Sequence, residues 1–283
     1  METIETAAET RNIKKKTYPI KKVKNPTLTI GLILVAFLLL MMLGGLLFSP
    51  YRAEQMNKKE KFLAPCFTHL MGTDNFGRDI FTRVQKGMGM TVLIALSVTA
   101  IGAFLGTILG AVTGYYGGWL DEILMRLNDM LAAFPGILLA LVFISVLGNG
   151  KYNIILALGI IFIPSYARIV RGEFLRLREA DYVKSAKLMG ASDFRIMWVH
   201  ILPNGLPALL SALTVGFNNA VLAEAGMSYL GIGVQPPDAS LGRMLSEAQG
   251  YLFSAPWYAL CPGLVIILLI LGFSFISEGI TGR

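Results

Sequence analysis

Charged residues are scarce in this chain. They make up 15% of the 283 residues, whereas a soluble globular domain carries about a quarter. Hydrophobic residues account for 54% and the mean hydropathy is +0.61. This balance excludes an ordinary soluble domain and is typical of a polytopic membrane protein. The net charge of +7 does not favour a nucleic-acid partner, because the basic runs flank hydrophobic stretches, as they do in cytoplasmic loops.

Cysteine and histidine are also rare, with two residues of each. Cys66 falls in a predicted loop and Cys261 at the start of a hydrophobic run, so we expect two unpaired thiols and no metal site. A phosphate loop and a nucleophile–base pattern are both missing. Gly148-Asn149-Gly150-Lys151 lacks the first glycine and the Ser/Thr of such a loop, and we predict a short turn there. We therefore expect no catalysis, no bound cofactor and no ATP hydrolysis by this chain alone.

Six hydrophobic stretches are long enough for membrane helices, which need about 20 apolar residues each. Pro164 interrupts the fourth, and Asn218 and Asn219 interrupt the fifth. We interpret the first stretch as a retained span, because its apolar run is too long for a signal peptide. The six predicted spans are 28–48, 90–113, 124–147, 153–170, 204–223 and 259–277.

The distribution of lysine and arginine predicts that both ends lie in the cytoplasm. In that orientation 16 of them fall in inside segments and nine in outside segments, as the positive-inside rule favours. The lysine runs near the N-terminus are expected to lie free or on anionic lipid headgroups. The predicted organisation is a cytoplasmic basic tail (1–27), a first span (28–48), an extracytoplasmic loop (49–89) and a five-helix core (90–280) with a cytoplasmic loop at 171–203.

Glycine recurs at every fourth position of the second span, at Gly102, Gly106, Gly110 and Gly114. This spacing places the four glycines on one helix face, where another backbone can approach closely. We predict close helix packing along that face.

Residues 179–203 form a polar, charged stretch of helix formers between two hydrophobic spans. Such a helix cannot lie in lipid, so it must lie on the aqueous side, where it can contact a soluble partner. Gly190 predicts a bend, after which Ser192 or Asp193 can cap a second short helix. Leu202-Pro203 is expected to close the stretch. From these residues alone, an ordinary interfacial amphipathic helix is the alternative.

This stretch resembles the cytoplasmic signature of the inner-membrane subunits of binding-protein-dependent ABC importers. That signature reads Glu-Ala-Ala, three residues, Gly, nine residues, Ile, one residue, Leu-Pro. The spacing is intact here, although three side chains differ. The matching positions are Ala186, Gly190, Leu202 and Pro203, and the departures are Lys184, Ser185 and His200.

Further segments resemble the C-type subunit of the peptide and nickel branch of that family, and together they extend over about residues 28–280. They are Glu179–Val183, Gly190–Ser192, His200–Asn204, Gly72–Asp74, Gly77–Asp79, Gly114–Gly118, Asp121, Arg126, Phe134-Pro135, Ser228–Gly233, Pro236-Pro237 and Trp257.

The resemblance implies an all-α, type I permease fold with six transmembrane helices in the inner or plasma membrane of a prokaryote. It implies half of a pore for di- or oligopeptides, or for nickel or a metal chelate, since the two branches share these motifs. The implied partners are a second homologous permease, two ATP-binding subunits that hold ATP and Mg²⁺, and an extracellular solute-binding protein. The implied ATPase-coupling residues are Glu179, Ala180, Ala186, Gly190, Ala191, Asp193, Leu202 and Pro203.

Two acidic residues are candidates for intramembrane charge, which usually marks a transport pathway: Asp129 falls in the first turns of the third predicted span, and Glu224 lies at the outer end of the fifth. Asp129 is expected to pair with Arg126 or to cap a neighbouring helix end. Asn218, Asn219 and Glu224 are candidates for pore lining, with a polar contact inside the bundle as the alternative. An ion-coupled secondary transporter is the alternative function from a different class. Such a transporter would carry more buried charges and often an internal repeat, whereas this sequence has at most two such charges and no visible repeat.

Overall fold

The structure is a computed structural model that describes residues 26–47 and 51–281. Within those ranges the regular elements are helices, and one isolated bridge pairs Thr73 with Asp79. The all-helical expectation is therefore confirmed. The predicted basic tail and its lysine runs lie outside the described residues, apart from its last two positions.

Five segments of the described chain are long and apolar enough to cross a membrane, and a bent helix pair gives a sixth if it is taken as one span. The five segments contain α1 (Pro26–Leu47), α2 (Ile80–Tyr116), α5 (Lys151–Leu177), α8 (Leu202–Tyr229) and α10 (Pro256–Thr281). The bent pair consists of α3 (Gly118–Ala132) and α4 (Gly136–Leu147).

The predicted single helix over 124–147 is wrong, because the chain turns by 89° between α3 and α4. Phe134-Pro135 lies in the break. A proline disfavours helical conformation in the residue before it and cannot donate a backbone hydrogen bond. Residues 124–147 are predominantly apolar on both sides of this break, so hydropathy alone did not reveal the turn.

The second span begins earlier than predicted, at Ile80 instead of residue 90. Asp79 caps α2, and its Oδ2 accepts a hydrogen bond from the backbone N–H of Thr82 at 2.7 Å. Hydropathy marks only the lipid-crossing part of a helix, whereas the cap marks its start. The loop before α2 is therefore shorter than the predicted 49–89.

The spans after the turn at 148–150 are also longer than predicted. α5 continues through Pro164 to Leu177, and α8 continues through Pro207 to Tyr229. The predicted turn is confirmed: Gly148 and Gly150, between α4 and α5, have φ values of 85° and 145°.

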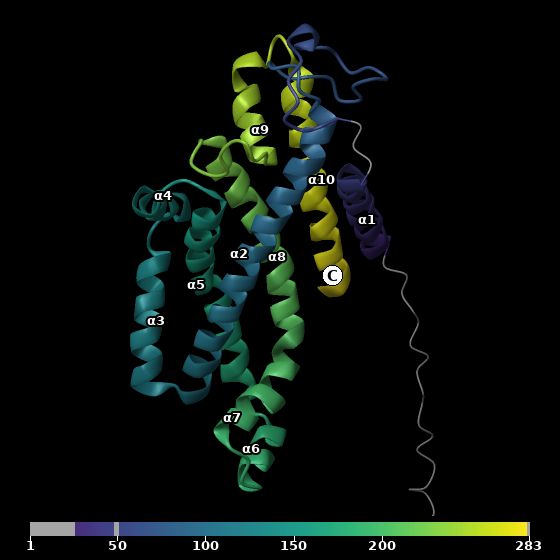
Figure 1. Ribbon diagram of the computed structural model, residues 1–283. Coiled ribbons are helices and arrows are strands. Elements are labelled where there is room, and N and C mark those ends of the chain that lie inside the picture. The colour runs from purple at the N-terminus through teal and green to yellow at the C-terminus, as the bar shows by residue number, and fades with distance from the viewer. Residues whose placement is uncertain (1–25, 48–50, 282–283) are drawn as a thin grey trace, which may run out of the picture.

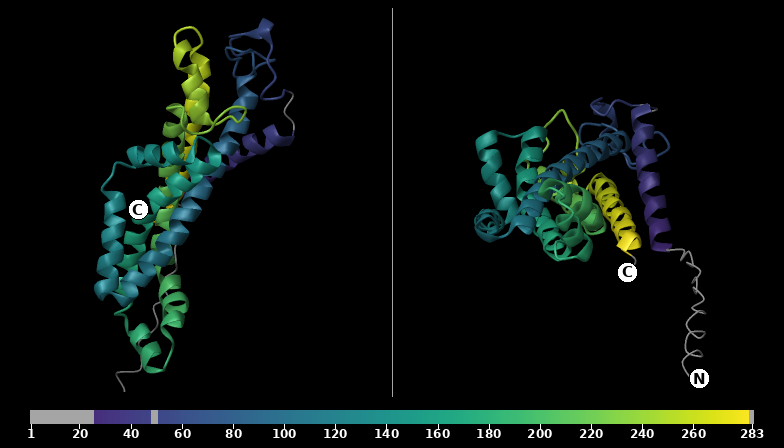
Figure 2. Two further views of the ribbon diagram at one scale, coloured as in Figure 1. Left: turned by 60° about the vertical axis from the view of Figure 1, so that its left-hand side comes forward. Right: turned by 90° about the horizontal axis from the view of Figure 1, so that it is seen from below.

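The helices form an elongated bundle with α2 at its centre, packed against α5 and α8, while α1 packs against α10 (Figures 1 and 2). One end of the bundle carries α6 (Asp181–Leu188) and α7 (Asp193–Arg195), and the opposite end carries the loop at 51–79 and α9 (Leu241–Ala248) (Figure 1). Three short helical turns complete the described chain: η3 (Lys58–Glu60), η4 (Ile196–Ile201) and η5 (Gln249–Tyr251).

Buried apolar side chains form two clusters. The larger one joins α1, α2, α4, α5, α8, α9 and α10, and the smaller one lies where α2 and α5 meet the residues around α6 and η4. The smaller cluster contains Ala111, Phe174, Val183, Ala186 and Ile196. The segment between α5 and α8 is therefore folded onto the bundle and does not hang from it as a loose loop.

Candidate functional site

The polar segment (residues 179–203) forms two helical pieces joined by a turn at Gly190. Gly190 has a φ of +81°, a conformation that side-chain-bearing residues rarely adopt. The backbone N–H of Ala191 bonds the carbonyl of Ala186, and that of Gly190 bonds the carbonyl of Lys187, which together close the end of α6. A Cβ at Gly190 would meet no atom within 4 Å. Backbone conformation, not lack of space, thus requires glycine here.

The second piece of the polar segment starts at Ser192, whose side chain accepts a hydrogen bond from the N–H of Arg195. From there the helix runs through α7 and the π-helical turn η4 directly into α8. The expectation that Leu202-Pro203 closes the stretch is wrong. Pro203 directly follows the π-helical turn η4, in which the backbone already departs from the α-helical hydrogen-bond pattern, and the helix continues through it to Tyr229.

The tip of the polar segment exposes apolar side chains. Leu188, Met189 and Phe194 are 89%, 82% and 73% exposed, although Val183 and Ile196 on the other side are buried in the smaller cluster. The segment therefore has one apolar face packed on the bundle and a second apolar surface that is uncovered in this chain.

The predicted coupling residues fall on different parts of this segment. Glu179 is exposed and lies 3.4 Å from Arg178 and 4.0 Å from Lys184. Ala180 is the residue before α6, and Ala186 is buried. The carboxylate of Asp193 accepts a hydrogen bond from the Tyr115 hydroxyl of α2 at 2.6 Å.

The glycine-rich face of α2 lies against α5. A Cβ at Gly110 would lie 2.5 Å from the carbonyl oxygen of Ala167, and one at Gly114 would lie 2.8 Å from that of Arg171. Added Cβ atoms at the two earlier positions, Gly102 and Gly106, would likewise meet α5 atoms at 2.8 and 2.6 Å. The two backbones approach so closely that no side chain fits between them.

Asn218 and Asn219 lie beside clefts on α8. Asn219 is exposed and lines a cleft of about 310 Å³ between α5 and α8, together with Tyr166 and Ser211. Asn218 donates a hydrogen bond to the Ser274 hydroxyl of α10 at 2.9 Å. Both residues also line a second cleft of about 500 Å³, between α8 and α10.

Glu224 is fully buried and does not line either cleft. Its carboxylate accepts hydrogen bonds from the hydroxyls of Thr91 at 2.8 Å and Ser228 at 2.6 Å, and Ser240 is its third hydroxyl neighbour. Each hydroxyl oxygen in turn accepts a backbone N–H, from Leu241, Val234 and Arg243 respectively. Glu224 thus joins α2 and α8 through hydroxyls whose oxygens are bonded to the backbone that leads into α9.

The expected pairing of Asp129 with Arg126 is wrong. Asp129 lies 3.2 Å from Arg168 of α5, and Arg126 lies 3.3 Å from Glu122 one turn earlier. The bend between α3 and α4 folds α3 back beside α5, so a residue distant in sequence becomes the nearer cation. The two pairs are exposed, and such pairs contribute little to stability.

The opposite end of the bundle holds a group of buried charges that the sequence did not reveal. Arg83 donates to Asp74 at 2.6 Å and to Glu247 at 2.9 Å. Arg78 contacts the same two carboxylates at 2.6 and 2.9 Å, and the Tyr258 hydroxyl donates to Glu247 at 2.9 Å. We call these five residues the ionic cluster. It fastens the 51–79 loop to α2, α9 and α10.

The pKa of Glu247 in the ionic cluster is lowered. Burial alone would raise it, but the positive charges of Arg83 and Arg78 and the hydrogen bonds from Arg83 and Tyr258 outweigh that effect. The arrangement therefore keeps Glu247 ionised. A signal was present in the sequence, since Arg83 stands close to the start of a hydrophobic span and has to be paired there.

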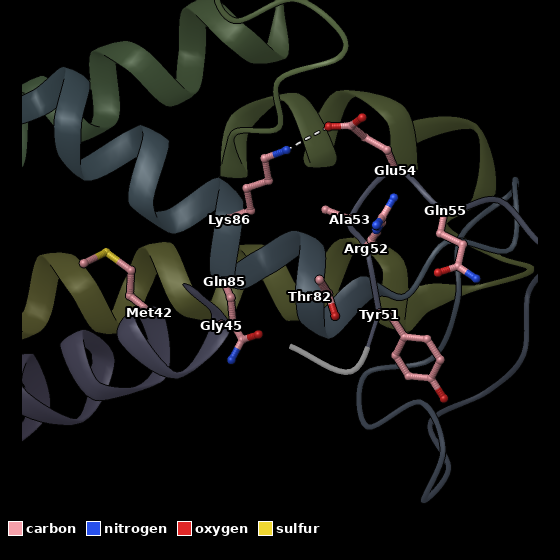
Figure 3. Close-up of a pocket in the computed structure, with 10 residues that line it drawn as sticks. All are labelled: Met42, Gly45, Tyr51, Arg52, Ala53, Glu54, Gln55, Thr82, Gln85 and Lys86. Carbon is pink, nitrogen blue, oxygen red and sulfur yellow. Dashed lines mark hydrogen bonds and ion pairs between the residues drawn. The ribbon is translucent and has the colours of Figure 1, made fainter. Parts of the chain in front are cut away.

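A large cavity of about 850 Å³ lies near the ionic cluster, between the end of α1, residues 51–55 and the first turns of α2 (Figure 3). Lys86 points toward Glu54 across its rim, and the two form an ion pair at 2.8 Å (Figure 3). None of the site residues predicted from the sequence lines this cavity. Among the described residues, no group of three or more His, Cys, Asp or Glu is placed to hold a metal ion.

Long apolar helices, with a folded polar segment at one end, define an integral membrane protein. Residues 106–283 match the family described as the binding-protein-dependent transport system inner membrane component. The chain belongs to this family. It is accordingly a multi-pass inner-membrane permease of an ABC importer, and it is not itself the ATPase.

Curated relatives match most of the chain. It is 38% identical to the dipeptide transport system permease protein DppC of Alkalihalophilus pseudofirmus, over 91% of this chain and 84% of that protein. It is 42% identical to a putative peptide transport system permease protein of Brucella suis, over 89% and 84%. It is 38% identical to the glutathione transport system permease protein GsiD of Pectobacterium atrosepticum, over 82% and 77%.

The fold also matches a solved structure. An inward-facing conformation of the MetNI methionine ABC transporter superposes with a TM-score of 0.59 at 18% sequence identity, covering 70% of this chain and 94% of that one. At this identity the likeness establishes the shared fold of ABC importer permeases and nothing about the substrate.

Proposed function

We propose that this chain forms half of the translocation pore of an ATP-driven importer for di- or oligopeptides. The names of its relatives support this substrate class, because dipeptide, peptide and glutathione permeases are 38–42% identical to it. A second, homologous permease supplies the other half of the pore. A solute-binding protein delivers the peptide from outside, as the family description requires.

The polar segment is the part that docks onto the ATP-binding subunits. The observation that carries this assignment is its uncovered apolar tip, formed by Leu188, Met189 and Phe194. An apolar patch that faces water marks a protein contact. Two ATP-binding subunits hold ATP and Mg²⁺, and this chain binds neither. The coupling residues are those that the sequence predicts: Glu179, Ala180, Ala186, Gly190, Ala191, Asp193, Leu202 and Pro203.

The proposed topology has six spans in a type I importer arrangement, with both chain ends in the cytoplasm. The α3–α4 pair counts as one broken span, and the charge distribution sets the orientation. The polar-segment end then faces the cytoplasm and the ionic-cluster end faces outward. Lipid surrounds the exposed apolar faces of the helices, with α1 at the side of the bundle (Figure 2).

Cys66 provides a natural probe of this topology. It is exposed in the 51–79 loop, and its contact with the Thr68 hydroxyl lowers the pKa of its thiol. A membrane-impermeant maleimide should label Cys66 in intact cells, and labelling should persist at a lower pH than for an ordinary thiol. A cysteine at Asp193, in a Cys66→Ser background, should react only after permeabilisation. Reaction of both cysteines from the same side would disprove the topology.

The cleft between α5 and α8 lines the peptide path in this proposal. Asn219 supplies an amide there, and Ser165 and Ser211 supply hydroxyls along otherwise apolar walls. Asn218 lines the neighbouring cleft, whereas Glu224 supports the outer end of α8 from inside the bundle. ATP-driven movement of the polar segment then switches the pore between inward and outward access by rigid-body motion.

Reconstitution tests the proposed function. The complete complex in vesicles, with its binding protein on the outside, should accumulate radiolabelled di- or oligopeptides when ATP is supplied at the ATPase side. Vesicles that hold the permease pair without ATPase should neither hydrolyse ATP nor accumulate peptide. Uptake of nickel or a nickel chelate, with no uptake from a panel of peptides and glutathione, would overturn the substrate assignment.

A further inference from the structure

The central helix α2 is long enough to connect both ends of the molecule. It contains 37 residues and therefore measures about 55 Å, against about 30 Å for the hydrocarbon core of a bilayer. Its first turns carry Arg83 of the ionic cluster, and its last turn carries Tyr115, which contacts the polar segment. One rigid element thus reaches from the outer loop to the proposed ATPase-docking segment.

The chain does not link α2 to the polar segment directly, because the segment is covalently continuous with α5 and α8. Contacts between side chains must therefore make α2 follow the segment. Apolar packing supplies part of this link, through Ala111, Val112 and Tyr115 in the smaller cluster. Apolar packing is weakly directional, so it does not by itself fix the position of the segment along the helix.

Two directional contacts hold the last turn of α2. The Tyr115 hydroxyl donates to the Asp193 carboxylate at 2.6 Å. The guanidinium of Arg178 donates to the carbonyl oxygens of Gly114 and Tyr115 at 3.2 and 3.4 Å, which would otherwise lack partners at a helix end. Arg178 stands just before the polar segment and Asp193 begins its second piece, so the same helix turn is held from both sides of the Gly190 bend.

The rest of α2 is packed so that a displacement of its last turn moves the whole helix. The backbones of α2 and α5 are in direct contact along the glycine face, and such close contact resists sliding. At the far end, Arg83 and Thr91 bond Glu247 and Glu224 of α9 and α8. A displacement of the last turn is therefore carried to the outer loop by a helix that is held along its whole length.

We infer that Tyr115 is a positioning residue for the transport cycle, which ties the end of α2 to the polar segment so that ATP-driven movement reaches the outer end of the pore. This rests on the proposed function of the polar segment. Tyr115 is not part of the docking surface: it is half-buried behind the segment, whereas the apolar tip lies on the segment's exposed side.

Tyr115→Phe tests the inference, because it removes the hydroxyl and keeps the ring that packs in the smaller cluster. Tyr116→Phe is the matched control, since Tyr116 is the next residue and is 56% exposed. The measurements use the full reconstituted complex. They are the amount of ATPase that co-purifies and the peptide transported per ATP hydrolysed, with the radiolabelled dipeptide, oligopeptide or glutathione that the wild-type complex takes up fastest.

Tyr115→Phe should retain wild-type amounts of ATPase but transport roughly three- to tenfold less peptide per ATP, the range expected for one ordinary intramolecular hydrogen bond at an exposed position. Tyr116→Phe should stay within about twofold of wild type. In an Asp193→Ala background, Tyr115→Phe should have no further effect, because its acceptor is gone. An unchanged transport ratio, loss of ATPase, or an equal effect in the Asp193→Ala background would each overturn the inference.

A parallel Gly190→Val complex separates this inference from the proposed function on which it rests. If Gly190→Val releases the ATPase and Tyr115→Phe leaves coupling intact, only the role of Tyr115 fails. If Gly190→Val keeps both the ATPase and wild-type uptake, the polar segment is not the docking element, and the proposal for Tyr115 fails with it.

Discussion

The side chains at the two ends of the helix bundle lie in different environments. In the ionic cluster the charged side chains are paired and little exposed, with 0% and 4% for Asp74 and Arg83 and 13% and 17% for Arg78 and Glu247. In the polar segment the charged side chains are exposed, and so are large apolar ones such as Leu188 and Met189. At the ionic-cluster end the charged groups are paired within the chain. At the polar-segment end large apolar side chains remain uncovered and can contact another molecule.

This difference indicates which end keeps its shape and which end changes partners. Buried ion pairs are strongly destabilised when one member is lost, so they fix a local geometry. Exposed apolar side chains gain stability only when a partner covers them. The ionic cluster therefore fixes structure within the chain, whereas the polar segment is, in the proposed function, the interface that ATP-binding subunits cover.

The largest effect is expected from Arg83→Met. It leaves Asp74 and Glu247 buried with only Arg78 as counter-ion, and breaking a buried pair in this way costs about 3–5 kcal/mol. The midpoint of thermal unfolding in detergent should fall accordingly. Arg126→Met, at an exposed pair with Glu122, should change it little. Equal shifts of the unfolding midpoint for the two substitutions would show that burial of the ion pairs at this end does not contribute to stability.

The same cluster predicts a dependence on pH. Because the pKa of Glu247 is lower in the folded protein, its contribution to stability is fully present above its ordinary pKa. The contribution is lost as the pH falls through the lowered value. Thermal unfolding of the wild type should therefore become easier on acidification in that range, and Arg83→Met should weaken this dependence.

A smaller loss of stability is expected from Glu224→Gln. The hydroxyls of Thr91 and Ser228 donate to Glu224, and their oxygens accept backbone N–H groups. A glutamine amide would face a donor with a donor, at a cost of about 1–3 kcal/mol. Glu122→Gln, at an exposed carboxylate, is the control. Wild-type unfolding of Glu224→Gln would contradict the hydrogen-bonded arrangement around this carboxyl group.

The polar segment should respond more mildly to a backbone change. Gly190→Val forces a β-branched side chain into a left-handed conformation, at a cost of about 1–2 kcal/mol, while Gly190→Asn is better tolerated there. Membrane insertion should be normal for both. Co-purification of ATPase should fall for Gly190→Val and stay near wild type for Gly190→Asn. Equal loss in both variants would point to a steric role, which the open space around Gly190 does not support.

Much of the fold followed from hydrophobic runs, because the bilayer imposes one simple length rule. Run length could not locate helix ends outside lipid, where caps such as Asp79 decide. It also missed the bend at Phe134-Pro135, because residues 124–147 are predominantly apolar on both sides of the break. The continuous helix through Leu202-Pro203 was missed because a proline usually marks a helix boundary, whereas here a π-helical turn precedes it and the helix continues.

The candidate site was predictable where a backbone requirement was visible in the sequence. Gly190 and Ser192 mark the bend and the cap of the polar segment, and the structure has both. Contacts between distant segments were not visible. The Tyr115–Asp193 bond spans 78 positions and the Arg83–Glu247 pair spans 164, and no local pattern encodes either. The predicted partner of Asp129, Arg126, was wrong for the same reason, because the observed partner Arg168 lies 39 positions away in the sequence.

The most direct test of the account is site-specific photo-cross-linking in native membranes, with benzoylphenylalanine placed at Met189 and, separately, at Phe253. Met189 is 82% exposed at the tip of the polar segment, and Phe253 is fully exposed next to η5 at the opposite end. The account predicts a covalent adduct with an ATP-binding subunit from Met189 and none from Phe253. An adduct with the ATPase from Phe253, or none from Met189 in an actively transporting complex, would contradict it.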